Sequence, residues 1–425
     1  MKVLWITPNL TPEFSKELKL EKQPSGSWLG TLSRNLVEKY NVDLHILVLG
    51  QKNLDYTKEI AGITYHYRNS SGSVFKDNPK IKKLLAEIVS EIEPELIDLQ
   101  GIEFHYCKYL SSEDYDVPIV STIQGLTSEI YKYTTGGLSF YQQVKNRTLK
   151  DWLFFDGLYE RKYRYYKRGM SETETIKKNK YFIGRTFWDK SKIFSLNSNA
   201  KYYHCEHEIR KEFYGRCWDY DDVEPQTIFM SQANTAFKGL HVLLKAVFLV
   251  KKKFPNTKLK IAGINPINNS TILDKMKRGT YSSFIENEIS RLGLGGSIEF
   301  LGVLDGDKMS LELSKSNCYI LPSLIENSPV SLSEAQLIGT PVISSFVGGC
   351  PESVSHNFDG YLYNSMEPES LAYYISDLFS NKEKCEFLSI NAKNNALNKF
   401  KNTDATRRAY DIYIDIIDDF QKLKH

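Results

Sequence analysis

The sequence lacks the long apolar segments and the charge excess that would indicate a membrane or nucleic-acid partner. No apolar run among its 425 residues approaches the roughly 18 residues needed to cross a bilayer. The start, MKVLWITPNL, has too few consecutive apolar residues for a secretory signal. The 55 basic residues are nearly balanced by 52 acidic ones, so the net charge is only +3 and nucleic-acid binding is not expected. We therefore expect a cytoplasmic protein.

Paired cysteines are also missing. The six cysteines are dispersed without a CxxC pair, as expected for reduced thiols buried as small apolar groups. The cluster Tyr203-His-Cys-Glu-His207, with Cys217 further along, fits none of the usual spacings of a structural zinc site. We therefore expect no bound metal.

Biased tracts and internal repeats are absent as well. Apolar residues make up 41% of the chain, charged residues make up 25%, and the 14 prolines are scattered, which is the composition of a folded protein. A chain of 425 residues is too long for one ordinary core. The length therefore predicts two domains of roughly 200 residues each.

Strand-like and helix-like segments alternate through both halves of the chain. The N-terminal half has expected strands at 3–7, 42–49, 63–67, 96–99, 118–123 and 181–183, and expected helices at 29–40, 80–92 and 141–168. The C-terminal half repeats the pattern, with strands at 226–231, 258–262, 297–301, 318–321 and 341–345, and helices at 239–254, 283–292, 307–316 and 328–339. This alternation predicts parallel sheets covered by helices on both faces.

We therefore predict an α/β protein with two doubly wound, Rossmann-like domains. The first domain is expected at 1–200, a polar and aromatic connector at 201–225, and the second domain at 226–407. A last helix is expected at 404–423. It is long enough to reach back to the first domain, to which we assign residues 408–425.

The stretch SLIENSPVSLSEAQLIGT (323–340) combines a strand-end loop with a helix start. Ser328 is a plausible N-cap, Pro329 suits the first helical position, and Gly339 is placed to end the helix. In an open parallel sheet, ligands bind in the crevice beyond the carboxyl ends of the strands. The backbone N–H groups at this helix start therefore predict an anion site suited to a diphosphate.

Two carboxylates, Glu326 and Glu334, flank that helix start. Glu334 lies about 7 Å along the helix axis, which is a reasonable reach from a diphosphate to the sugar of a nucleotide. A carboxylate can accept hydrogen bonds from two neighbouring hydroxyls, so both glutamates suit sugar recognition. The alternative is that both are ordinary solvated surface charges.

From Gln226 onward the sequence resembles the retaining nucleotide-sugar glycosyltransferases of the GT4 type, which have the GT-B fold of two Rossmann-like domains. The matching stretches are FKGLHVLLKAV (237–247), LKIAG (259–263), IEFLGVL (298–304), YILPSLIENSPVSLSEAQLIGTPVISS (319–345), Gly348-Gly349, Pro351-Glu352 and HNFDGYLY (356–363). They follow the family's order and cover most of residues 226–380. The two glutamates match the family's E-x7-E motif.

The resemblance implies specific roles for several residues. Glu334 would bind the donor ribose, Glu326 would lie beside the donor sugar and the reaction centre, and Lys238 would neutralise the diphosphate and stabilise the leaving group. The loop and helix start beside them would also contact the donor, through Asn327, Ser328, Pro329 and Val330.

The sequence departs from the family pattern at two positions. Where the family usually has an arginine, about six residues before the lysine, this chain has Gln232, which supplies no charge. Arg185 is one candidate replacement. Many members also have a histidine facing the donor sugar, where this chain has Gln124, which cannot act as an acid or a base near neutral pH. Gly26 lies where the family uses glycine for a close approach to the donor or acceptor.

The resemblance implies transfer of a sugar from a nucleotide diphosphate sugar to a glycan or lipid-linked acceptor hydroxyl, with retention and in cell-surface glycan or polysaccharide assembly. Neither a metal nor a cofactor is expected, since no Asp-x-Asp stands in a strand-end loop. The alternatives are a GT-B phosphorylase or sugar-phosphate synthase, and a non-catalytic sugar-nucleotide-binding or partner subunit, which Gln232 and Gln124 make conceivable. A nicotinamide dehydrogenase is disfavoured because no G-x-G-x-x-G follows the first strands.

Residues 144–168 mix aromatic and basic side chains. One interpretation is a solvated helix that packs through its aromatic side. The other is peripheral contact with the anionic inner surface of a membrane, which would suit a lipid-linked acceptor.

Overall fold

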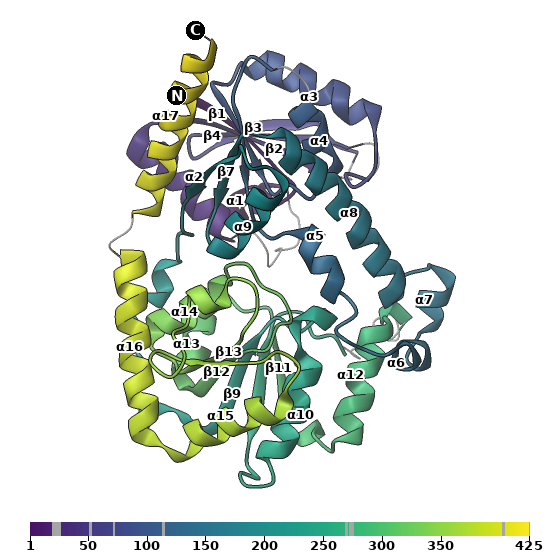
Figure 1. Cartoon of the computed structure of the whole chain (residues 1–425), viewed down its shortest axis with the longest axis vertical. Helices are drawn as coiled ribbons and strands as arrows, with labels where there is room; N and C mark the ends of the chain where they lie inside the picture. Colours follow the sequence, from purple (N-terminus) through teal and green to yellow (C-terminus); the bar gives the residue numbers. More distant parts are fainter. Residues whose placement is uncertain are drawn as a thin grey trace. The chain divides into compact units, whose positions relative to one another are not determined.

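The computed structural model describes residues 1–18, 27–50, 53–70, 73–112, 115–267, 271, 276–401 and 404–424. They form two compact units (Figure 1). The first unit comprises Met1–Ser128, Tyr166–Glu208 and Thr403–His425, and the second comprises Glu129–Tyr165 and Ile209–Asn402. Residues 129–165, expected in the first domain, and 209–225, expected in a connector, therefore belong to the second unit.

The first unit is built on an eight-stranded sheet of order β3-β4-β2-β1-β5-β6-β7-β8. Its strands are β1 (Lys2–Thr7), β2 (Asp43–Gly50), β3 (Tyr56–Ile60), β4 (Ile63–Asn69), β5 (Leu96–Gln100), β6 (Ile119–Thr122), β7 (Tyr181–Gly184) and β8 (Lys201–His204). All neighbours are parallel except β3 and β4, which form an antiparallel hairpin. Val3 and Trp5 face one apolar core while Leu4 and Ile6 face another, so helices cover both faces of the sheet, as predicted.

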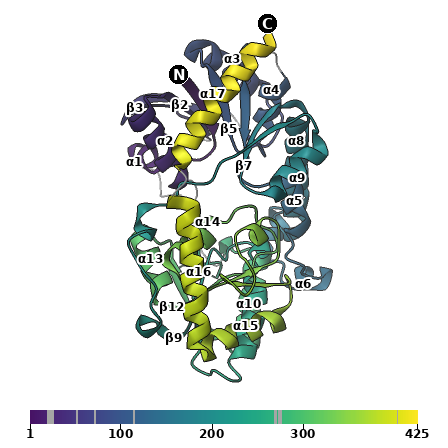
Figure 2. The same cartoon turned by 60° about the vertical axis from the view of Figure 1, so that its left-hand side comes forward.

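The helices of the first unit pack through apolar stripes. They are α1 (Pro12–Glu17), α2 (Ser27–Tyr40), α3 (Pro79–Ile92), α4 (His105–Ser112), α9 (Phe187–Leu196) and α17 (Ala405–Lys424), together with the C-terminal part of α8 (Leu158–Lys178). In α3 the buried residues Ile81, Leu85, Ile88 and Ile92 recur every three or four positions. The last helix, α17, packs along α2 in the first unit, as predicted (Figure 2).

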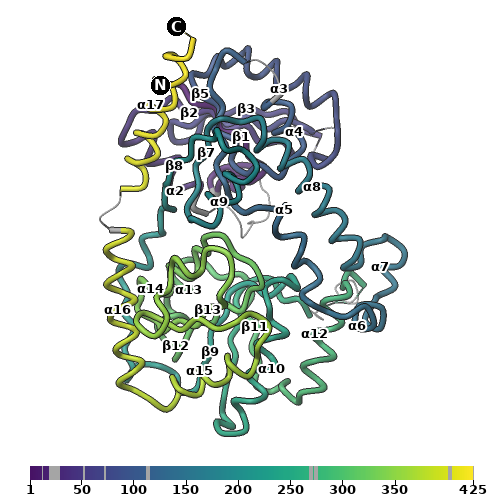
Figure 3. Tube along the Cα trace, viewed as in Figure 1, coloured from purple at the N-terminus to yellow at the C-terminus, as the bar shows by residue number. Residues whose placement is uncertain are grey.

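The second unit has a six-stranded sheet of order β11-β10-β9-β12-β13-β14, with every pair parallel. Its strands are β9 (Glu224–Ser231), β10 (Lys258–Ala262), β11 (Ile298–Gly302), β12 (Ser316–Leu321), β13 (Val342–Ser345) and β14 (Tyr361–Tyr363). The described helices of its longer segment, Ile209–Asn402, are α10 (Leu240–Val250), α12 (Thr280–Arg291), α13 (Gly306–Lys315), α14 (Val330–Ile338), α15 (Pro368–Ser380) and α16 (Lys382–Lys401). Figure 3 shows the trace of these elements around the sheet.

The strand order places a topological switch point between β9 and β12. From β9 the chain moves outward through β10 and β11, and it then returns to β12 on the other side of β9. In open α/β sheets, ligands bind beyond the carboxyl ends of the strands at such a switch point. The loops after β9 and β12 are the two that contain Lys238 and Glu326.

The single helix predicted at 141–168 is wrong. The structure has α6 (Phe140–Lys145), α7 (Leu149–Leu153) and then α8, separated by two turns. Thr148 caps α7 by accepting a hydrogen bond from the Asp151 N–H, and Phe155 has a left-handed φ of 49°, which a continuous helix does not allow. In the ranges that the structure describes, no helix has the length and apolar content of a membrane span.

Candidate functional site

The loops after β9 and β12 are held tightly against each other. Gly239 has φ +76°, and a Cβ atom at this position would lie 1.9 Å from the carbonyl oxygen of Pro322, so the close approach of the two backbones requires glycine. The N–H of Leu324 donates to the carbonyl of Phe237 at 2.8 Å. The loop that contains Lys238 is therefore fixed to the loop that contains Glu326.

Lys238 and Glu326 form an ion pair at this junction. The lysine Nζ lies 2.6 Å from the glutamate Oε1, and the hydroxyl of Ser323 donates to the same oxygen at 2.7 Å. Both charged side chains are mostly buried, with 20% of Lys238 and 12% of Glu326 exposed. The structure thus brings together two residues that stand 88 positions apart in the sequence.

A third loop, after β13, closes around Glu326. Gly348 has φ +51°, and a Cβ atom there would lie 1.8 Å from the carbonyl oxygen of Glu326. The N–H of Gly349 donates to that same oxygen at 3.2 Å. The Gly348-Gly349 pair found in the sequence therefore has a structural reason, because it lets the backbone approach and fix the Glu326 loop.

Helix α14 begins at Val330, one residue later than predicted. Its N-cap is Pro329, and Ser328 lies outside the helix. The reason is that Pro329 has an extended backbone, with ψ 107°, instead of the helical one that the first position requires. Asn327 is buried, and Ser328, Pro329 and Val330 are half-buried. Gly339, with φ +90°, ends the helix as predicted.

The N-cap residue of α14, Pro329, makes no side-chain hydrogen bond to the first turn of the helix. The first backbone N–H groups of a helix have no intrahelical acceptor, so an uncapped first turn can donate to an anion. Its position is fixed by hydrogen bonds, since the hydroxyl of Tyr319 donates to Ser331 Oγ at 2.7 Å and lies 2.8 Å from Ser231 Oγ. Residues of β9, β12 and α14 are thereby joined beside the ion pair.

Glu334 is paired with an arginine that sequence reasoning missed. Nε and Nη2 of Arg210 donate to the Glu334 Oε1 at 3.1 and 2.7 Å. The glutamate is 3% exposed, and its burial raises the pKa of its carboxyl, an effect that the positive charge of Arg210 opposes. The guanidinium also lies 4.8 Å from the ring centre of Phe213. Arg210 therefore holds the Glu334 carboxylate in place.

Gln232 follows the last residue of β9 and is exposed. Its φ is +61°, a left-handed conformation that non-glycine residues rarely adopt. Its N–H donates to the carbonyl of Ala262 at 2.9 Å, so the backbone is held at the end of the sheet while the side chain is exposed.

In the first unit, Gln124 ends a chain of hydrogen bonds. Its amide donates to Gln100 at 3.3 Å, and the amide of Gln100 donates to Asp98 at 2.7 Å. Asp98 also accepts from the hydroxyl of Tyr413 in α17 at 2.5 Å. Burial raises the pKa of Asp98 to about 6, an effect that these hydrogen bonds oppose. Gln124 is half-buried and oriented by this chain.

Arg185 is buried in the first unit, with 5% of the residue exposed. Its guanidinium donates to the carbonyl of Ile123, and desolvation lowers the pKa of its side chain. These contacts favour a structural role over the diphosphate contact that the sequence suggested. Gly26 lies outside the described residues. Among the residues that are described, no group of three or more His, Cys, Asp or Glu residues has a metal-binding arrangement.

Comparisons with known proteins identify the second unit. The family described as Glycosyl transferases group 1 matches residues 219–395. An uncharacterized glycosyltransferase, MJ1607, of Methanocaldococcus jannaschii is 26% identical over 192 residues, which are 45% of this chain and 45% of that protein. A UDP-Gal:alpha-D-GlcNAc-diphosphoundecaprenol alpha-1,3-galactosyltransferase of Escherichia coli is 30% identical over 105 residues, covering 25% of this chain and 27% of that protein. Both matches span less than half of the relatives' lengths.

Solved structures match nearly the whole chain. The sucrose-phosphate synthase of Thermosynechococcus elongatus has a TM-score of 0.72 at 15% identity, over 98% of each chain. Anabaena HepE, solved in complex with UDP and glucose, has a TM-score of 0.67 at 15% identity, over 97% of this chain and 98% of that one. At such identities the likeness shows the fold alone. The family match to the group 1 glycosyl transferases thus covers residues 219–395, less than half of the chain, and the solved structures show that the chain has the GT-B fold.

Proposed function

We propose that this chain is a metal-independent, retaining glycosyltransferase that moves a sugar from a nucleotide diphosphate sugar to an acceptor hydroxyl in cell-surface glycan assembly. The observation that carries the proposal is the ion pair between Lys238 and Glu326 at the switch point of the second sheet, beside the start of α14, which its N-cap residue Pro329 does not cap. A cation and a row of backbone donors suit a diphosphate, and a carboxylate next to them suits a sugar.

In this proposal the protein itself supplies the positive charge. The donor diphosphate accepts hydrogen bonds from the first turn of α14, and Lys238 stabilises the negative charge that builds up on the leaving group. Glu334 accepts from the ribose hydroxyls, and Glu326 faces the donor sugar. Because Gln124 cannot accept a proton near neutral pH, the departing phosphate oxygen takes the proton of the acceptor hydroxyl.

The names of similar proteins support the donor and acceptor classes. HepE was solved with UDP-glucose, and the E. coli relative uses UDP-Gal and a diphosphoundecaprenol-linked acceptor. We therefore propose a nucleoside diphosphate sugar as the donor and a glycan or lipid-linked hydroxyl as the acceptor. The assignment of the protein to the cytoplasmic face of a membrane belongs to the same proposal.

A thermal-shift panel with UDP, GDP, ADP and their sugars tests the donor. A ligand at 100 times its dissociation constant stabilises the folded state by about 2.7 kcal/mol, which is several degrees for a unit of this size. Lys238→Ala is the matched variant, and it should reduce the response. A panel in which no nucleotide diphosphate raises the melting temperature of the parent protein would reject the proposal.

Product analysis tests the reaction. The parent protein, the responding nucleotide sugar and a set of hydroxyl acceptors should give a product whose anomeric configuration equals that of the donor. A product formed only with inorganic phosphate or a sugar phosphate would indicate the phosphorylase or synthase alternative. Donor binding without turnover on any acceptor would favour a non-catalytic subunit.

A further inference from the structure

Residues 140–165 of the second unit present an unusual apolar surface, which we call the aromatic tip. Ten of the 28 large apolar side chains that are exposed in the described residues lie within these 26 positions. Their exposed fractions range from 46% to 81%. They are Phe140, Tyr141, Val144, Leu149, Trp152, Leu153, Phe154, Phe155, Tyr159 and Tyr163. Exposed apolar residues are normally scattered singly, so such a concentration indicates an interaction surface.

Three polar side chains of the same segment bind residues in α12 or just before it. Asp151 is fully buried and accepts hydrogen bonds from the N–H and the hydroxyl of Thr280, at 2.5 and 2.7 Å, which caps the start of α12. Thr148 donates to the carbonyl of Arg278 at 3.0 Å. Asn287 donates to Asn146 at 2.7 Å. Figure 1 shows α6 beside α12. The segment is therefore anchored through polar contacts, while its apolar side chains remain exposed.

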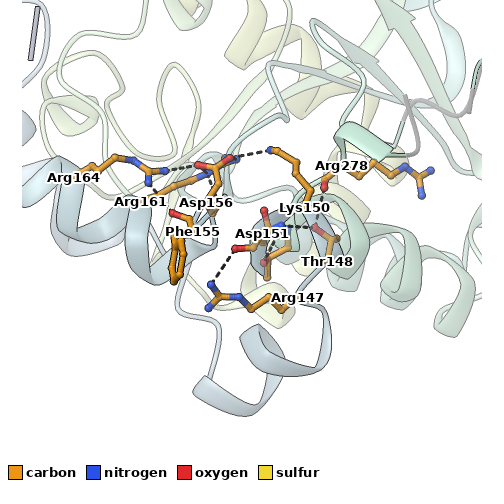
Figure 4. A network of polar contacts seen from close by, with 10 residues as sticks. Arg147, Thr148, Lys150, Asp151, Phe155, Asp156, Arg161, Arg164 and Arg278 are labelled. Carbon is orange, nitrogen blue, oxygen red and sulfur yellow. Dashed lines mark hydrogen bonds and ion pairs between the residues drawn. The ribbon is translucent and has the colours of Figure 1, made fainter. Parts of the chain in front are cut away.

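One carboxylate organises the cations of the tip. Asp156 accepts hydrogen bonds from Lys150 at 2.9 Å, from Arg161 at 2.8 Å and from Arg164 (Figure 4). Burial opposes the ionisation of Asp156, but the hydrogen bonds from Arg161 and Lys150 outweigh it and lower the pKa of the carboxyl. Three cations share one negative charge, so the cluster keeps an excess of positive charge at the surface.

The two phenylalanines before Asp156 are held outward by a strained turn. Phe155 has φ +49°, which costs a bulky side chain backbone energy and persists only where surrounding contacts impose it. Arg164 donates to the carbonyl of Phe155 at 3.1 Å, and the N–H of Asp156 donates to the carbonyl of Asp151 at 3.2 Å. Phe154 and Phe155 are 73% and 69% exposed. The contacts therefore fix a turn that exposes two aromatic rings.

Charge decides between the partners that an apolar surface could bind. Residues 140–165 contain six basic and three acidic residues, a net charge of +3 that equals the net charge of the whole chain. Trp152 adds an amphipathic ring, with the Arg147 guanidinium 4.2 Å from its centre. Trp, Tyr and Phe interleaved with Lys and Arg suit the headgroup region of an anionic bilayer.

We propose that the aromatic tip docks the protein onto the surface of an anionic lipid membrane, with its apolar side chains entering the headgroup region and its cations facing lipid phosphates. The proposal names the surface that would hold the protein at the membrane face included in the proposed function, and it rests on that function only for this location, since docking needs neither donor nor acceptor. Docking to a membrane would also bring the protein to the surface in which a lipid-linked acceptor is embedded.

Co-sedimentation of the full chain with vesicles tests the docking. Vesicles of phosphatidylcholine with about one third phosphatidylglycerol should bind the protein at least tenfold more tightly than vesicles of phosphatidylcholine alone, and salt should weaken the binding. Leu153→Ser/Phe154→Ser should reduce this binding at least tenfold. Lys145→Glu/Lys162→Glu should do the same, because each basic residue near an anionic surface contributes about fivefold. Both double variants change exposed or half-exposed side chains, so the parent melting temperature should be kept.

Matched controls change similar residues elsewhere on the second unit. Tyr373→Ser/Ile390→Ser removes two side chains that are 70% and 60% exposed, and Lys252→Glu/Lys253→Glu reverses two exposed charges. Both controls should bind anionic vesicles as the parent does. Brominated lipid should quench the fluorescence of Trp152, and Trp152→Phe should lose that quenching while still binding.

Three results would overturn the proposal. The parent protein could fail to bind anionic vesicles, or the tip variants could bind as tightly as the controls. The third is self-association of the parent in sedimentation equilibrium that Leu153→Ser/Phe154→Ser abolishes, which would assign the surface to a second copy of the chain.

Discussion

Replacing Arg210 with alanine tests whether this arginine holds Glu334 in the position that the proposed donor site needs. Arg210 is the positive partner of a carboxylate that is only 4% exposed, while its own side chain is 25% exposed. Removing one partner of a fully buried pair costs about 3 to 5 kcal/mol, so a partly exposed arginine should cost about 2 to 3 kcal/mol. In a unit of roughly 200 residues this loss lowers the melting temperature by about 4 to 12 °C.

The loss should depend on pH in a defined direction. Burial raises the pKa of Glu334 above its ordinary value, and the variant loses the arginine that opposes this effect, so the pKa should rise further. A carboxyl whose pKa is raised on folding stabilises the folded state below its unfolded pKa, and this contribution is lost as the pH rises through the folded pKa. The difference in melting temperature between parent and variant should therefore be large at neutral pH and should shrink towards pH values near the ordinary pKa of glutamate.

A second substitution separates stability from binding. In Arg210→Ala/Glu334→Gln no charge remains to be buried, so most of the lost stability should return. Nucleotide binding should not return, because the ribose loses a charge-assisted acceptor worth about 1.5 to 3 kcal/mol, or roughly 10-fold to 150-fold in the dissociation constant. Calorimetry with the responding nucleotide measures this constant. Arg291→Ala is the control, since its pair with Glu288 leaves the arginine 59% exposed and should contribute less than about 1 kcal/mol. Tighter nucleotide binding by Arg210→Ala would refute the reasoning, because it would show that the arginine blocks the carboxylate.

Three further substitutions or treatments test other parts of the site. Lys238→Ala should reduce kcat far more than Gln232→Ala, because a full charge acts on the leaving diphosphate whereas an amide adds a hydrogen bond of roughly 1 kcal/mol; equal losses in steady-state kinetics would contradict this. In the proposed site Lys238 and the first turn of α14 supply the positive charge, so turnover should survive EDTA; activity that returns only with added magnesium or manganese would count against this. Tyr413→Phe removes a hydroxyl that donates to Asp98, so the pKa of Asp98 should rise above about 6. The stability that the variant loses relative to the parent should then grow as the pH rises from acid to neutral. A loss that is constant with pH would show that Asp98 does not titrate in this range.

Most of the fold could be predicted because both halves of the chain repeat buried strands and amphipathic helices. Three strands were missed, β3, β8 and the three-residue β14, and the first two have weak patterns. In β3 (YTKEI) most side chains are exposed at the edge of the sheet, and in β8 (KYYH) only Tyr203 is buried, so neither resembles the apolar core strands. The error at 141–168 has another origin, since helical periodicity continues across the turn at Phe155 that ends α7 and precedes α8.

Some residues of the candidate site could be predicted from local sequence motifs, whereas others depend on contacts between distant parts of the chain. The E-x7-E motif and the sequence FKG are local, so Glu326, Glu334 and Lys238 could be found from the sequence. Arg210 lies 124 positions from Glu334, and the two meet only because the short segment around Lys211–Phe213 packs against α14. No periodicity or motif marks such an arginine. The burial of Arg185 could not be predicted from the sequence either, because its guanidinium bonds to the carbonyl of Ile123, 62 positions away.

If the proposed function holds, the ion pair between Lys238 and Glu326 lets two opposite charges act in one reaction. Without a donor, each neutralises the other, and Ser323 holds the carboxylate. In the proposed reaction, an arriving diphosphate offers Lys238 a stronger anionic partner. Glu326 then faces the sugar, where its negative charge favours the positive charge that develops as the glycosidic bond breaks. Glu326→Gln should therefore lower kcat and nearly keep nucleotide affinity, since the amide still fits the loop. Lys238→Ala/Glu326→Gln should lose less than the sum of the two single losses, because the residues act in one step. Additive losses in kcat, or full kcat in Glu326→Gln, would show that the pair only holds the two loops together.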